Sequence, residues 1–168
     1  MKAAGVPFHA RIVGEGPLRP SLERLAGQLG VAADITFTGH LPQHEVWNQL
    51  AWADVLLHTG VIAPSGDRDG LPNVIPEAMS VGVLVVTSPT AATTEAVTQG
   101  ITGLVAPVDA ADTWVSALRR LSTDDPFAEK LRAGARQWVE ENFDAHKNAA
   151  RLLGHFERVV SVAPAPAA

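Results

Sequence analysis

The stretch "GDRDGLPNVIPEAMSVGVLVV", residues 66 to 86, joins an acidic corner to a short helix pattern and a strand. Asn73 suits the N-cap of the helix, and Pro76 falls in the first turn, where its missing N–H has no intrahelical partner. Gly82 ends the helix, and the run "VLVVTS" (83–88) resembles a strand buried on both faces of a parallel sheet. This stretch therefore predicts an α/β fold.

The same alternation extends along the chain. Strands are expected at 8–14, 35–39, 54–59, 83–88 and 102–107, and helices at 18–29, 44–53, 73–81, 110–122, 126–142 and 145–160. One face of the first helix is apolar: Leu18, Leu22, Leu25, Ala26 and Leu29. The pattern indicates a Rossmann-like parallel sheet with helices on both faces. Ligands bind such sheets beyond the carboxyl ends of the strands, so the loops there are the candidate sites.

Composition excludes several classes of protein. The chain has 168 residues, of which 46% are hydrophobic and 18% charged, as expected of one globular domain. A net charge of −5 argues against a nucleic-acid partner, and the lack of cysteine excludes a disulfide framework. No apolar run is long enough to span a membrane. We expect one domain over 1–160 and a disordered Pro/Ala-rich tail over 161–168.

Two loops leave alternatives open. Gly14 and Gly16 lie between a strand and a helix, where glycine permits close approach of a phosphate. They are equally compatible with an ordinary corner, and Glu15 argues against direct phosphate contact. His40 and Leu41 follow the strand at 35–39, where a flat base could contact the backbone; for His40 alone, an ordinary corner with a surface histidine is favoured.

The corner "DGLPN" (69–73) is the most informative loop. Asp69 and Glu77 are separated by seven residues, and Glu77 lies about one turn into the helix. A carboxylate accepts two hydrogen bonds at once and suits a vicinal diol, and backbone N–H groups at a helix start suit anionic or hydroxyl-rich ligands. Alternatively, Asp69 caps a turn and Glu77 favours the helix dipole. A ligand site is the preferred interpretation.

Other catalytic patterns are not present in the sequence. The six histidines have no metal-ligand spacing, so no metal site is expected, and neither a nucleophile elbow nor a P-loop occurs. Asp54 and His58 are interpreted as residues at the ends of a strand rather than as a catalytic pair.

Six blocks of the chain resemble a known family in sequence, order and spacing: "IVGEGPLRPSLERLAGQLGV", "ITFTGHLP", "ADVLLHTG", "DGLPNVIPEAMSVGVLVVTS", "TEAV" and "GITGLVAP". They resemble the C-terminal, donor-binding domain of retaining glycosyltransferases of family 4 (glycosyl transferases group 1), which have the two-domain GT-B fold. The resemblance covers residues 8 to 143.

The resemblance implies a role for each matching residue. Asp69 would be the catalytic-site acid that holds the hydroxyls of the transferred sugar, and Glu77 would bind the ribose. Gly70 and Leu71 would offer backbone N–H groups to the sugar and diphosphate. The loop at His40 and Leu41 would contact the base. The donor-binding set is Gly14, Gly16, His40, Leu41, Asp69, Gly70, Leu71, Pro72, Asn73 and Glu77.

Three features depart from the family pattern. Asp69 replaces the usual glutamate and is one methylene shorter, and Ala91 and Ala92 replace a pair of glycines before Glu95. The family's domain also begins with a strand and a helix that carry an arginine and a lysine for the diphosphate, and this chain starts after them. By resemblance, the domain is N-terminally truncated and its sheet lacks a central strand.

The expected function is therefore the donor-binding half of a retaining glycosyltransferase, inactive alone. Its donor is a nucleotide-diphosphate sugar with no further cofactor, and a missing N-terminal domain would hold a glycan or lipid acceptor, as in cell-surface polysaccharide biosynthesis. The expected location is the cytoplasm, including the inner face of the membrane by peripheral association. One alternative is a non-catalytic binding or interaction module derived from such an enzyme. A nucleotide-sugar epimerase is a third hypothesis, against which the pattern from Asp69 to Glu77 argues.

Overall fold

The computed structural model describes residues 1–68, 70–90 and 92–162. Asp69, Ala91 and the last six residues of the predicted tail lie outside the described residues. The strands are β1 (Ala10–Val13), β2 (Ile35–Gly39), β3 (Val55–His58), β4 (Leu84–Thr87) and β5 (Leu104–Val105). The α-helices are α1 (Arg19–Gln28), α2 (Gln43–Trp52), α3 (Val74–Ser80), α4 (Thr93–Ala96), α5 (Ala111–Thr123), α6 (Asp125–Asn142) and α7 (Ala145–Val162), and two 3₁₀ turns are η1 (Lys2–Ala4) and η2 (Ala32–Asp34).

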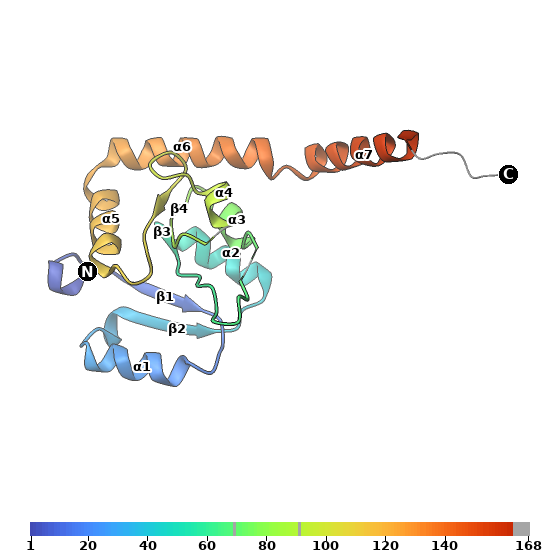
Figure 1. The fold of residues 1–168 in the computed structure, drawn as a ribbon. Coiled ribbons are helices and arrows are strands. Elements are labelled where there is room, and N and C mark those ends of the chain that lie inside the picture. The colour runs from blue at the N-terminus through green and yellow to red at the C-terminus, as the bar shows by residue number, and fades with distance from the viewer. Residues whose placement is uncertain (69, 91, 163–168) are drawn as a thin grey trace.

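The α/β class with parallel strands is confirmed, but the described strands form two sheets instead of one. β1 pairs in parallel with β2, with Arg11 opposite Thr36. β3, β4 and β5 form a second parallel sheet with β4 in the centre. Figure 1 shows β1 on the side of β2 that faces the three-stranded sheet. β1 and β3 are thus edge strands of their sheets.

The core forms on the two faces of β4. Val85 points into a cluster with residues of α2 and α3, including Leu50, Ile75 and Met79. Its neighbours Leu84 and Val86 point the other way, into a cluster that α5 and α6 complete. Side chains alternate between the faces of a strand, so the continuous apolar run at 83–88 serves both clusters. The prediction of a strand buried on both faces is confirmed.

The first half of the chain contributes little to this core. Among residues 1–49, only Ala26 and Gly39 are buried. The leucines on the predicted apolar face of α1 are at least 40% exposed, from Leu22 at 40% to Leu18 at 68%. The helical spacing was therefore correct, but the described residues do not cover that face.

α6 and α7 complete the fold. α6 runs across the top of the three-stranded sheet, and α7 continues away from the body of the domain (Figure 1). Within the described ranges, no helix combines the length and the apolar character needed to cross a membrane.

Candidate functional site

The loops that follow β1 and β2 lie against each other. The backbone N–H of Gly14 donates to the carbonyl of Gly39 across 2.9 Å. Gly39 has φ of +77°, and a Cβ there would lie 2.7 Å from Oε1 of Glu15. Glycine is therefore favoured at position 39 by its backbone angle, whereas the contact could be relieved by a shift of the flexible Glu15 side chain. This contact brings two of the predicted loops together at the carboxyl end of the sheet.

The loop around Gly16 has its own partners. Its carbonyl accepts the N–H of Arg19 across 3.1 Å at the start of α1. The guanidinium of Arg19 binds Glu15 at 2.7 Å and Glu23 at 2.9 Å, and these carboxylates, Glu23 foremost, raise the pKa of Arg19. The cation in this loop is therefore already balanced by two acids.

The connection from β2 to α2 approaches α3. His40 is exposed and Leu41 is half-buried, and Pro42 then leads directly into Gln43, the first residue of α2. Nε2 of Gln43 donates to Oε1 of Glu77, 34 residues further along, across 3.2 Å. The structure therefore joins the predicted base loop to the predicted ribose carboxylate. Gln43 carries no signal in the sequence, because its partner is distant in the chain.

The corner before α3 is anchored on its apolar side. Leu71 is half-buried and packs against the core cluster that contains Ile75, while Gly70 and Asn73 are exposed. Pro72 is half-buried, and its carbonyl accepts the N–H of Ile75 across 3.0 Å. These contacts fix the start of α3, and with it the position of Glu77.

Asn73 occupies the N-cap position of α3, but its side chain makes no capping hydrogen bond. Its backbone is helical, with φ of −56° and ψ of −29°, whereas a capping side chain normally needs an extended backbone. The predicted helix boundary is correct and the predicted capping role is wrong. The predicted catalytic residue, Asp69, lies outside the described residues.

A buried polar network at the ends of β3 and β4 was missed by the sequence analysis. Nδ1 of His58 lies 3.1 Å from Oγ1 of Thr87, and the hydroxyl of Ser88 donates to the carbonyl of Gly60. The hydroxyl of Thr93 donates to the carbonyl of Ser88 across 2.9 Å. These bonds tie the loop after β3 to the loop after β4. Asp54 precedes β3 and His58 ends it, as predicted.

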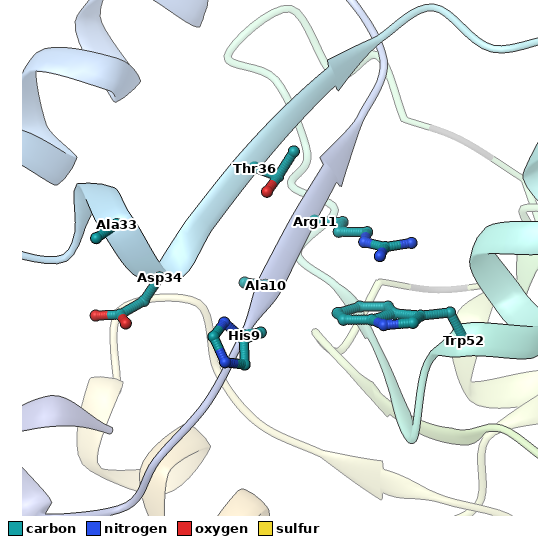
Figure 2. A pocket seen from close by; sticks show the side chains of 7 residues that line it. All are labelled: His9, Ala10, Arg11, Ala33, Asp34, Thr36 and Trp52. Atoms are coloured by element: carbon teal, nitrogen blue, oxygen red, sulfur yellow. The ribbon is translucent and has the colours of Figure 1, made fainter.

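A pocket of about 240 Å³ lies at the opposite edge, near the start of β1 and β2. Figure 2 shows its lining: His9, Ala10, Arg11, Ala33, Asp34, Thr36 and Trp52. The guanidinium of Arg11 stacks 3.8 Å from the centroid of the Trp52 ring. None of the predicted donor-binding residues lines this pocket, so the two features are distinct. In the described ranges, no three His, Cys, Asp or Glu side chains are grouped as metal ligands.

The family assignment rests on sequence comparison. A family profile described as "Glycosyl transferases group 1" matches residues 2–138, and the chain belongs to this family. It is 34% identical over 145 residues to a putative colanic acid biosynthesis glycosyltransferase, WcaL, of Salmonella typhimurium, covering 86% of this chain and 36% of that protein. It is 34% identical to a GDP-mannose-dependent alpha-(1-6)-phosphatidylinositol monomannoside mannosyltransferase of Mycolicibacterium smegmatis, covering 84% and 37%. The chain thus spans little more than a third of the length of these relatives.

Solved structures agree on the fold. Anabaena Alr3699/HepE in complex with UDP superposes with a TM-score of 0.79 at 19% identity, over 90% of this chain and 41% of that one. A glycosyltransferase from Rickettsia africae superposes with a TM-score of 0.77, over 96% and 42%. The fold is one Rossmann-like half of a GT-B glycosyltransferase.

Proposed function

We propose that this chain is the donor-binding half of a retaining glycosyltransferase. The position of Glu77 is the main support. Glu77 is half-buried, follows the loop at the carboxyl end of β3, and accepts a hydrogen bond from Gln43, next to the loop of His40 and Leu41. Parallel sheets bind ligands at this edge, and a carboxylate there suits the two hydroxyls of a ribose.

The remaining roles follow from this placement and from the family resemblance. The backbone at His40 and Leu41 would contact the base. The N–H groups of Gly70 and Leu71, in the corner with Pro72 and Asn73, would bind the sugar and the diphosphate. Asp69 would hold the transferred sugar as the catalytic-site acid, and Gly14 and Gly16 would border the diphosphate.

The names of similar proteins support a nucleotide-sugar donor. The Anabaena protein was solved with UDP and with UDP-glucose, and the mycobacterial relative is named for GDP-mannose. Other relatives are named for colanic acid and amylovoran biosynthesis. We therefore propose a glycan or lipid acceptor, held by a further domain at the cytoplasmic face of a membrane.

Transfer of the sugar needs positive groups that stabilise the leaving diphosphate. The predicted donor-binding set contains no Lys or Arg, and Arg19 is engaged by two carboxylates. We propose that the isolated chain binds donor without turnover and with no metal or other cofactor. Sugar transfer or donor hydrolysis by the purified chain would contradict this part of the proposal.

Titration of the purified chain with UDP-glucose and GDP-mannose, followed by calorimetry and NMR, tests donor binding. Glu77→Gln keeps the shape of the side chain but removes its charge, so it should weaken binding by about tenfold or more, as expected for loss of charge-assisted hydrogen bonds. Glu45→Gln is the matched control, because Glu45 lies in the first turn of α2 and accepts a hydrogen bond from Asn48 instead.

The alternative function is a non-catalytic binding or interaction module. An absence of binding for both donors would refute the donor-site proposal and favour an interaction role. Equal effects of the two Glu→Gln variants would contradict the specific role of Glu77.

A further inference from the structure

Gln43 is hydrogen-bonded to Glu77 and therefore lies where it can contact a molecule bound by that carboxylate. It opens α2 directly after the extended Pro42, whose ψ is 157°, so its side chain projects from the end of the β2–α2 connection. Its amide donates to Oε1 of Glu77 across 3.2 Å. The hydrogen bond therefore links α2, which follows β2 of the first sheet, to α3, which follows β3 of the second sheet.

The carboxylate of Glu77 has further capacity to accept hydrogen bonds. Two carboxylate oxygens offer about four lone-pair positions, and Gln43 uses one of them. Within the described residues, Glu77 forms no ion pair. The neutral amide of Gln43 thus orients the Glu77 carboxylate, whose negative charge remains available to the hydroxyl groups of a ligand.

Gln43 also contributes an acceptor of its own. Nε2 of its amide is given to Glu77, and the oxygen Oε1 of the same amide group carries two lone pairs that can accept hydrogen bonds. Two neighbouring acceptors, one from each residue, match the two donors of a vicinal diol.

We infer that Gln43 is a second diol-recognising residue of the donor site, which orients Glu77 and accepts one ribose hydroxyl itself. This inference rests on the proposed donor function. It makes the pair of Gln43 and Glu77 a discriminator between ribose and 2′-deoxyribose, because loss of one hydroxyl leaves one acceptor of the pair without its donor.

The pair can be tested without damage to the fold. Gln43 is exposed and α2 is anchored through Leu50, which is 5% exposed in the core cluster, so removal of the Gln43 side chain leaves no cavity. Gln49 is the matched control on the same helix. Its amide oxygen accepts a hydrogen bond across 2.8 Å from Arg11, which lines the pocket.

The experiment measures affinities of the chain for UDP, GDP and their 2′-deoxy forms by calorimetry, with NMR detection of the Gln43 side-chain amide. The wild-type chain should prefer the ribonucleotide by about threefold to tenfold, the size expected for one hydrogen bond. Gln43→Ala should reduce this preference to about one, and Gln43→Glu should weaken ribonucleotide binding through repulsion from Glu77. Gln49→Ala should retain the wild-type preference.

Two results overturn the inference, and they are distinguishable. If Glu77→Gln weakens binding while Gln43→Ala keeps both the affinity and the ribose preference, the donor site stands and the role of Gln43 is wrong. If the wild-type chain binds none of the four nucleotides and neither nucleotide-sugar, the proposed function and this inference both fail.

Discussion

Gly134 illustrates how one residue can depend on a contact far away in the chain. It lies inside α6, and a Cβ at this position would come within 2.3 Å of the carbonyl oxygen of Ile101. In an exposed helix, Gly→Ala normally stabilises by about 1 kcal/mol. Here the added methyl group would displace backbone, so the helix approaches the loop before β5 only because residue 134 has no side chain.

We predict that Gly134→Ala lowers the free energy of unfolding by about 1–3 kcal/mol, the usual cost of overpacking. Gly27→Ala in α1 is the matched control, since a Cβ there meets nothing within 4 Å. The control should gain about 0.5–1 kcal/mol from helix propensity. Urea unfolding of both variants measures the difference, and a gain for both would show that the contact with Ile101 relaxes without cost.

Whether the role of a residue could be predicted from the sequence depended on how far along the chain its partner lies. Gly82 ends α3 with φ of +82°, as the local pattern predicted. Gln43, His58 and Gly134 act through partners at least 29 residues away, and no local pattern encodes such contacts. The capping role of Asn73 failed because the backbone before α3 is already helical.

At the scale of elements, α7 begins with a capped first turn. Oδ1 of Asp144 accepts the N–H of Lys147 across 2.8 Å. This bond, followed by the attraction of Lys147 and a weaker influence of His146, holds the pKa of Asp144 below its ordinary value. The cap therefore favours the helix when Asp144 is ionised, that is, above the pKa of about 3.9 in the unfolded chain.

We predict that the first turn of α7 frays as the pH falls through the native pKa of Asp144, because protonation removes the charge that favours the bond. NMR titration of the Asp144 carboxyl and of the Lys147 amide measures this. Asp144→Asn should keep a cap that does not titrate, since Asn and Asp cap equally well. A carboxyl pKa at or above the ordinary value would contradict the prediction.

Elements were largely predictable because their apolar spacing is local. The expected helices at 126–142 and 145–160 correspond to α6 (Asp125–Asn142) and α7 (Ala145–Val162). The strand expected at 102–107 is shorter in the structure, Leu104–Val105, because only these residues pair with β4. Pairing depends on the neighbouring strand, and the sequence of one strand does not reveal where its neighbour ends.

At the scale of the whole molecule, stability should be distributed unevenly between the two sheets. Both core clusters are built from residues 50–135, around β4. The pair of β1 and β2 carries exposed apolar side chains, with Ile12 at 39% and Val13 at 41%. A pair of strands that buries little apolar surface is at best marginally stable. The sequence predicted the strands of both sheets but placed them in one sheet, because strand pairing and burial depend on the tertiary arrangement.

We predict that amides of β1 and β2 exchange with solvent through openings of much lower free energy than amides of Val85 and Val86 in β4, which approach the global value. Native-state hydrogen exchange at increasing urea measures both. The stack of Arg11 on Trp52 and its bond to Gln49 join β1 to α2. Arg11→Ala should therefore accelerate exchange in β1 and β2 while leaving β4 nearly unchanged. Equal opening free energies in both sheets would contradict the uneven distribution and indicate a single cooperative unit.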